Sequence, residues 1–160
     1  MIGGTMGVGK TAVSRQLKTD LPNSVFLDGD WCWDSHPFQV TEETKAMVMD
    51  NITHLLNNFI RCRAYENIIF CWVMDRQSIL DDLLSRLDLS HCHVNAVSLL
   101  ADEHTLTERI KGDVESGVRT MDVLPRSLAR LPLYHDLNTV KIHTGGKSVP
   151  QIAAEILSLP

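Results

Sequence analysis

Short apolar runs alternate along this chain with segments whose apolar residues repeat every three or four positions. The first pattern predicts buried strands, and the second predicts helices that cover them. We expect strands at 1–2, 24–27, 68–74, 94–100 and 139–142. We expect helices at 11–21, 41–60, 77–87, 106–114, 122–132 and 149–157. Strands and helices in this alternation indicate an α/β fold, with a parallel sheet covered on both faces.

The first predicted strand is short. Only Met1 and Ile2 precede the glycines, whereas a strand usually has about five or six residues. Two explanations stay open from the sequence: the strand is unusually short, or the chain begins a few residues late.

Composition narrows the class of protein. A length of 160 residues predicts a single domain, 1–160. Hydrophobic residues make up 44% and charged residues 22%, which excludes a disordered chain. No apolar run approaches the roughly 20 residues of a membrane-spanning helix, so we expect no membrane partner. The net charge of −5 disfavours broad nucleic-acid binding. Without a secretory signal pattern or a CxxC pair, free thiols and a cytoplasmic location are expected.

Residues 4–11 read GTMGVGKT and match GxxxxGK[ST] at every fixed position. In this motif the glycines let backbone N–H groups turn toward an anion at a helix N-terminus. The lysine adds a point charge for the β- and γ-phosphates, and the last hydroxyl can reach Mg²⁺. The segment therefore predicts a nucleotide-binding loop and indicates ATP and Mg²⁺ as ligands. Its residues are Gly4, Thr5, Met6, Gly7, Val8, Gly9, Lys10 and Thr11.

The same residues contain a rival pattern. Residues 7–12 also fit GxGxxA, and Asp28 follows about twenty residues later, as in an NAD-dependent oxidoreductase. That alternative needs the first strand to run through Gly3 and Gly4, and glycines weaken a strand interior. A GTPase is disfavoured because no NKxD tetrapeptide is present, and a motor ATPase or helicase needs a longer chain.

Beyond the loop, the chain resembles the small P-loop kinases, such as shikimate, gluconate and adenylylsulfate kinases and chloramphenicol phosphotransferase. The segments that carry the resemblance are LDGD at 27–30, LTER at 106–109, Arg119, and TGG at 144–146. The resemblance implies a P-loop NTPase fold: three α/β/α layers, a five-stranded parallel sheet in the order 2-3-1-4-5, and a short lid at about 112–120. No nucleoside monophosphate signature is present, and the segment after the third strand matches no one subfamily.

The resemblance also assigns roles. Lys10, Arg109 and Arg119 would act on the transferring phosphate, and Asp30 would orient or deprotonate the acceptor hydroxyl. Thr11 and Asp28 would serve the metal. The nucleotide would also contact Arg109 and the turn at Thr144 and Gly145. A simpler interpretation of Asp28 and Asp30 is that they only shape a turn around Gly29.

Other candidate residues could either contact the substrate or have only a structural role. If residues 28–33 are extended, Asp28 and Asp30 point the same way, and so do Trp31 and Trp33, which could stack on a substrate ring. Arg76 could anchor an anionic substrate group. Arg126 and Arg130 could help to neutralise the phosphates or could form a solvated face, and Trp72 is expected in the core. In a strand, His91 and His93 would point to one side and Cys92 to the other, so these three residues are not expected to share a metal ion.

These observations favour an ATP- and Mg²⁺-dependent kinase that phosphorylates a hydroxyl of a small molecule. The alternatives are a nucleotide-binding regulator without transfer activity, a kinase of a sugar nucleotide similar to zeta-type toxins, a polynucleotide 5′-end kinase, and the oxidoreductase. The chain is expected to be a monomer or a homodimer.

Overall fold

The structure is a computed structural model that describes residues 1–160. Its centre is a five-stranded parallel sheet in the order β2-β3-β1-β4-β5. The strands are β1 (Ile2–Gly3), β2 (Ser24–Asp28), β3 (Asn67–Cys71), β4 (Val97–Leu100) and β5 (Val140–His143). The order and the parallel direction confirm the fold expected from the resemblance.

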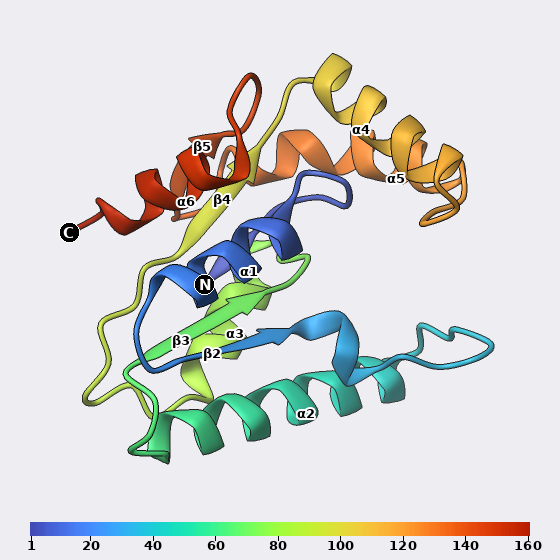
Figure 1. The fold of residues 1–160 in the computed structure, drawn as a ribbon. Helices are drawn as coiled ribbons and strands as arrows, with labels where there is room; N and C mark the ends of the chain where they lie inside the picture. Colours follow the sequence, from blue (N-terminus) through green and yellow to red (C-terminus); the bar gives the residue numbers. More distant parts are fainter.

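Six α-helices and two short 3₁₀ helices connect the strands (Figure 1). They are α1 (Lys10–Asp20), η1 (Gly29–Cys32), α2 (Glu42–Arg61), α3 (Gln77–Ser85), α4 (Glu103–Glu115), α5 (Val123–Arg130), η2 (Leu131–Tyr134) and α6 (Val149–Leu157). None of the helices is long and apolar enough to cross a membrane.

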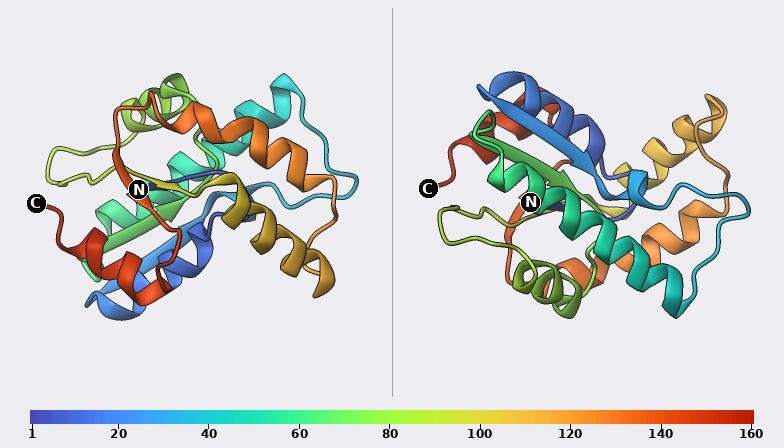
Figure 2. Two further views of the ribbon diagram at one scale, coloured as in Figure 1. Left: turned by 90° about the horizontal axis from the view of Figure 1, so that it is seen from above. Right: turned by 90° about the horizontal axis from the view of Figure 1, so that it is seen from below.

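Two hydrophobic clusters hold the helices to the two faces of the sheet. On one face, α1 and α6 pack together over Ile2, Leu99 and Ile142. On the other face, α2 and α3 cover Leu27 and Phe70. Figure 2 shows both faces, and Figure 1 shows α4 and α5 projecting beyond the carboxyl ends of the strands. The loops that follow β1, β2 and β4 therefore meet at that edge.

Two strands are shorter than the sequence pattern predicts. β3 ends at Cys71 rather than at residue 74, because its neighbour β2 ends at Asp28, where the chain turns into η1. β4 begins at Val97 rather than at residue 94. Residues 91–96 lie outside the ladder, although they are apolar in part.

β1 is the central strand, and it has only two residues. Ile2 is in register with Cys71 of β3 and with Val97 of β4. The amino group of Met1 is buried at the amino end of the strand and donates a hydrogen bond to the Asn95 carbonyl at 2.6 Å. An ionisable group therefore lies inside the sheet layer, where burial favours its uncharged form.

The free energy of unfolding is expected to rise between about pH 6 and pH 8 because of this amino group. Burial lowers its pKa to about 6 from the ordinary value of 8.0. Over that interval the unfolded chain binds more protons than the folded chain, so raising the pH favours folding. The cost of the buried charge, about 3 kcal/mol, is fully present below pH 6 and absent above pH 8.

Urea titrations across this interval measure the slope. The matched control is the Nα-acetylated protein, which differs only in this amino group. The acetylated form should lose this component of the slope, and identical slopes for the two forms would show that the amino group is solvated.

Candidate active site at the carboxyl edge of the sheet

The phosphate loop follows β1 directly and ends at the first turn of α1. Gly9 is the N-cap of α1, with a φ of 105°, and its carbonyl accepts the N–H of Val13 at 3.0 Å. Gly7 has a φ of 82°. These left-handed conformations favour glycine and let successive N–H groups turn toward one point. The loop thus has the backbone of an anion-binding nest at a helix N-terminus.

Substitution of Gly7 by alanine is expected to destabilise the protein by about 2–3 kcal/mol, and substitution of Gly9 by about 1 kcal/mol. Both changes place a side chain at positive φ. A Cβ on Gly7 would also lie 2.7 Å from Cγ1 of Ile110, whereas one on Gly9 meets no atom within 4 Å. Chemical denaturation of Gly7→Ala and Gly9→Ala measures the difference. Equal losses in the free energy of unfolding would show that the close approach of α4 to Gly7 does not contribute to the difference.

Lys10 lies at the centre of the loop. Its Nζ donates a hydrogen bond to the Thr5 carbonyl at 3.1 Å. Burial lowers the pKa of Lys10, while the nearby carboxylates of Asp30 and Asp28 act to raise it. An anion bound in the loop would give this ammonium a better partner than a neutral carbonyl.

Thr11 and Asp28 form a pair of oxygen ligands beside the loop. The Thr11 hydroxyl donates to Oδ2 of Asp28 at 2.7 Å, and the Asp28 side chain is almost fully buried. Mg²⁺ prefers hydroxyl, carboxylate, phosphate and water oxygens, so these two residues fit a magnesium ion. No cluster of three or more His, Cys, Asp or Glu residues could hold a metal without other ligands. A metal here would therefore share its ligands with a bound phosphate.

Asp30 follows on η1, where the chain is not extended. Its N–H donates to Oδ1 of Asp28 at 3.2 Å, so the two carboxylates are held in one tight turn. Burial raises the pKa of Asp30, and the neighbouring charge of Asp28 raises it further. The Lys10 charge and a hydrogen bond from the Trp72 side chain act in the opposite direction. A carboxyl group with a raised pKa beside a nucleotide loop is suited to proton exchange with a hydroxyl.

Trp72 fixes this turn from the adjacent strand. A Cβ on Gly29 would lie 2.6 Å from two ring atoms of Trp72, so the indole rests directly on the backbone of Gly29. Trp33 packs edge-on against Trp72, with ring centroids 6.4 Å apart. Asn51 of α2 also holds η1 in place, because its side chain donates to the Cys32 carbonyl at 2.9 Å.

Arg109 of α4 joins two loops across the edge. Its guanidinium donates to the Val8 carbonyl of the phosphate loop at 3.0 Å, and to the hydroxyl and the carbonyl of Thr144, each at 2.9 Å. The turn after β5 is thereby tied to the phosphate loop. Gly145 stands in the same turn, where a Cβ would lie 3.2 Å from the Asp102 carboxylate.

A match between the sequence and a family model decides the family of this chain. Residues 1–123 match the AAA_18 family model, described as an AAA domain. This match covers the phosphate loop, both aspartates of the turn, Arg109 and Arg119. The chain belongs to this AAA domain family.

Solved structures share the fold of this AAA domain over nearly its whole length. The tunicamycin resistance protein of Deinococcus radiodurans is 22% identical, with a TM-score of 0.74, and the match covers 99% of this chain and 94% of that one. A gluconokinase from Sinorhizobium meliloti is 20% identical, with a TM-score of 0.68 and coverage of 98% and 87%. Shikimate kinase from Acinetobacter baumannii, in complex with shikimate, is 20% identical, with a TM-score of 0.61 and coverage of 98% and 88%. Comparison with curated protein sequences gives no significant match.

Three further arginines of the AAA domain, in the expected lid and on α5, make ion pairs. The Arg119 Nε lies 2.8 Å from the Asp113 carboxylate, and its charge is near enough to lower the pKa of Lys10. Arg126 is exposed and pairs with Asp122 one turn away. Arg130 instead reaches across to Asp75, 3.1 Å away, which follows β3. Arg76 is exposed, next to Asp75, at the N-cap of α3.

The prediction that Trp31 and Trp33 share one side is wrong. It assumed an extended segment, but residues 29–32 form the 3₁₀ helix η1, which rotates alternate side chains away from one another. Trp31 is 55% exposed and packs on Phe26, with ring centroids 5.2 Å apart. Trp33 packs on Phe38 and Trp72. Asp28 and Asp30 are likewise brought together by the turn and not by alternation.

Two links at this edge were missed by the sequence analysis. The Thr5 hydroxyl donates to the Ser127 carbonyl at 3.0 Å, which attaches the phosphate loop to α5. Asp75 pairs with Arg130 beside the buried hydroxyl of Tyr134, whose pKa is raised by burial and by the Asp75 charge. The position of Asp75 after the third strand could have identified it as a residue of the edge. No sequence signal reveals the Thr5 contact.

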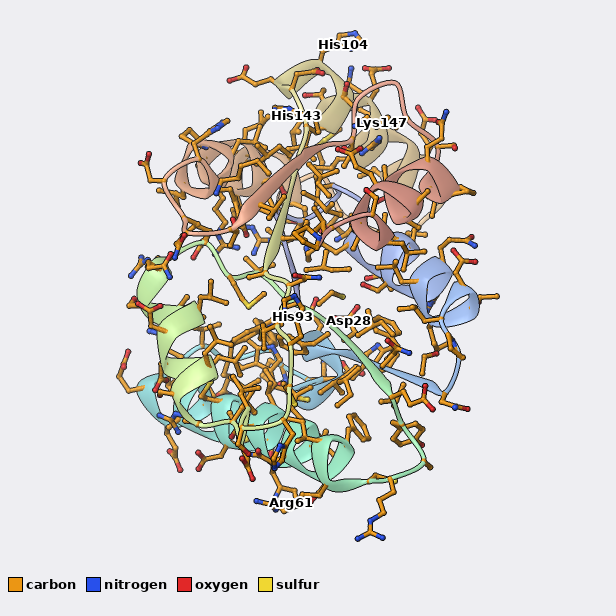
Figure 3. The ribbon with its side chains drawn as sticks, turned by 90° about the vertical axis from the view of Figure 1, so that its left-hand side faces the viewer. Asp28, Arg61, His93, His104, His143 and Lys147 are labelled. Carbon is orange, nitrogen blue, oxygen red and sulfur yellow. The ribbon has the colours of Figure 1, made fainter.

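Figure 3 views the molecule from the opposite, amino edge. It labels His93, on the segment before β4, between the half that contains α6 and the half that contains α2. The His93 ring nitrogen Nε2 lies 3.0 Å from both the Asn95 side chain and the Pro160 carbonyl. This histidine therefore lies away from the phosphate loop.

Proposed function

We propose that this AAA domain is an ATP- and Mg²⁺-dependent kinase that transfers the γ-phosphate of ATP to a hydroxyl of a small molecule. The observation that carries the proposal is that three features lie together at the carboxyl edge of the sheet. They are the anion-binding loop, the Thr11–Asp28 pair and the Asp30 carboxyl group. Phosphoryl transfer depends mainly on positioning and charge, and these groups supply both.

Each residue has a task in this proposal. The loop amides and Lys10 would hold the ATP phosphates, and Thr11 with Asp28 would hold the magnesium ion. Bound Mg²⁺ would neutralise charge on the phosphate oxygens. Asp30 would orient the acceptor hydroxyl and accept its proton. Arg109 would lie at the adenine side, between the phosphate loop and Thr144.

Closure over ATP belongs to the proposal as well. The lid would be the segment around residues 112–120, which contains Arg119. Transfer to an alcohol competes with hydrolysis by water, so a closed lid protects ATP until the acceptor is present. Arg119 would release Asp113 and approach the phosphates as the segment closes.

The acceptor class is tested by acceptor-dependent ADP formation. The panel contains gluconate and other sugars, shikimate, nucleosides, aminoglycosides and tunicamycin, with phosphate-ester formation followed by ³¹P NMR. The expected result is a phosphate ester and ADP in equal amounts with at least one compound. Tight ATP binding with no product from any acceptor would instead favour a nucleotide-binding regulator.

Thermal-shift titration distinguishes the kinase from the remaining alternative, an NAD-dependent oxidoreductase. ATP with Mg²⁺ is expected to raise the Tm, since a ligand of the folded state stabilises it by mass action. NAD(H) should leave the Tm unchanged. Stabilisation by NAD(H) and not by ATP would overturn the kinase proposal in favour of an oxidoreductase.

A further inference from the structure

An ion pair joins the segment after β3 to α5 at the carboxyl edge of the sheet. Nε of Arg130 lies 3.1 Å from Oδ2 of Asp75, whose side chain is only 12% exposed, while that of Arg130 is 39% exposed. Apart from this contact, the protein forms no hydrogen bond or ion pair with either side chain. Most acceptor sites of the carboxylate and most donor sites of the guanidinium therefore remain available to a ligand.

Asp75 lies close in the chain to the residues that hold the Asp30 turn. It comes three positions after Trp72. The Trp72 side chain rests on the backbone of Gly29 and bonds to the Asp30 carboxyl group. Asp75 and Asp30 thus stand on the segments that follow β3 and β2, which are neighbouring parallel strands.

Arg130 is attached to the phosphate loop through its own helix. Ser127, one turn earlier on α5, accepts a hydrogen bond from the Thr5 hydroxyl at 3.0 Å. Tyr134, on η2, lies over the residue directly before the loop, because a Cβ on Gly3 would be 3.7 Å from its Cε1 atom. The ion pair therefore stands between the start of the phosphate loop and the segment after β3, next to the Asp30 turn.

A buried hydroxyl adds an independent observation at this place. Tyr134 is fully buried, and its hydroxyl makes no hydrogen bond of ordinary geometry, although the Gly4 backbone is close. The Asp75 charge is near enough to raise the pKa of this hydroxyl. Buried polar groups nearly always have hydrogen-bond partners, so a cluster with unused bonding capacity is more typical of a binding site than of a packing contact.

The two charged groups have opposite hydrogen-bonding abilities. A carboxylate only accepts hydrogen bonds, and a guanidinium only donates them. An anionic ligand can bond to Arg130 but is repelled by Asp75, whereas an ammonium can bond to Asp75 but is repelled by Arg130. A hydroxyl both donates and accepts, so two neighbouring hydroxyls can bond to both groups at once.

We propose that the Asp75–Arg130 pair is the recognition site for the phosphate acceptor, and that this acceptor is an uncharged compound with a vicinal diol, from a sugar or a nucleoside ribose. The inference rests on the proposed kinase function, of which it names the substrate class. One hydroxyl donates to Asp75 and its neighbour accepts from Arg130. Another hydroxyl faces Asp30: its oxygen bonds to the γ-phosphorus as the bond to ADP breaks, and its proton passes to Asp30.

The test compares compounds that differ in charge but share their hydroxyls. Glucose with glucuronate and glucitol with gluconate represent sugars, and uridine with UMP represents nucleosides. Phosphate-ester formation gives kcat/KM for each compound, and we expect the uncharged member of at least one pair to be preferred by about a hundredfold or more. Equal use of both members, or preference for the acidic one, would overturn the proposal but leave the kinase function standing.

Asp75→Asn links the preference to the ion pair. The amide oxygen still accepts from Arg130, and the amide NH₂ can donate to an anionic acceptor, so the ratio of the two kcat/KM values should fall by about tenfold or more. Both acceptors are measured on one preparation, so the ratio does not depend on how much of the protein is folded. The control is Asp81→Asn, an exposed carboxyl of α3, which should keep the original ratio. An unchanged ratio in Asp75→Asn would show that the pair is only structural and would overturn the proposal.

Binding measurements separate this inference from the kinase proposal. Calorimetric titration with the same compounds, in the presence of Mg²⁺ and the non-hydrolysable nucleotide AMP-PNP, requires no transfer. Selective binding of an uncharged compound without ester formation would overturn the kinase function and still support the recognition site. The absence of both binding and transfer for every uncharged compound would overturn the recognition site.

Discussion

Lys10→Ala is expected to weaken ATP binding or turnover by more than about tenfold. Lys10 is the one cation within the phosphate loop, and Asp28 and Asp30 stand close enough to interact with its charge. Without the ammonium, the loop keeps its amides but loses the charge that balances the β- and γ-phosphates. The two acidic side chains would then repel the nucleotide. Isothermal titration with ATP and Mg²⁺ measures the binding, and ADP release measures the turnover.

The matched control is Lys18→Ala. Lys18 is exposed in the last turn of the same helix, so its loss changes the net charge equally but does not touch the loop. ATP binding by this variant should stay within about twofold of the original. If Lys10→Ala changes neither binding nor turnover, the assignment of the phosphate loop is wrong.

Asp30→Asn is expected to keep ATP affinity and to lose transfer by about a hundredfold or more. The amide has the size of the carboxyl group and preserves the turn, because the Asp28 carboxylate still accepts the N–H of residue 30. It cannot take a proton from the acceptor. The measurement is phosphate-ester formation with an acceptor identified by the screen, together with the ATP dissociation constant.

Asp34→Asn is the control for this change, since Asp34 is an exposed carboxyl four positions along the chain. It should transfer phosphate at the original rate. Unchanged transfer in Asp30→Asn would remove Asp30 from the mechanism, and loss of ATP binding would show that it acts on the nucleotide.

The phosphate loop and the order of elements are predictable from the sequence because both depend on local patterns. Gly4, Gly7 and Gly9 have backbone conformations that favour glycine, and Gly4 and Gly7 are also closely packed. These requirements fix the spacing of the glycines along the chain, so the motif can be recognised in the sequence. The helices follow from apolar repeats, and Thr41 caps α2 because its hydroxyl accepts the N–H of Thr44. The strand order came from the resemblance, since apolar runs alone do not say which strands are neighbours.

The details of the edge depend on contacts between distant residues, and these leave no local pattern. Trp72 lies against Gly29, and Thr5 bonds to Ser127, more than a hundred positions away. The turn at 29–32 is a 3₁₀ helix because the Asp28 side chain caps it, a short-range effect that competes with extension. Apolar composition also predicted too long a β4: residues 94–96 are apolar in part, but the ladder between β1 and β4 begins only at the pair Ile2–Val97.

The contact between Trp72 and Gly29 gives the protein an internal optical probe. The indole rests on the turn that carries Asp30, and it is partly solvated. Any ligand that shifts this turn or dries its surroundings alters the emission wavelength and quantum yield of that ring. A variant with Trp31 replaced by phenylalanine removes the most exposed indole and so sharpens the signal. Stopped-flow fluorescence could then time the arrival of nucleotide and acceptor separately, without any attached dye.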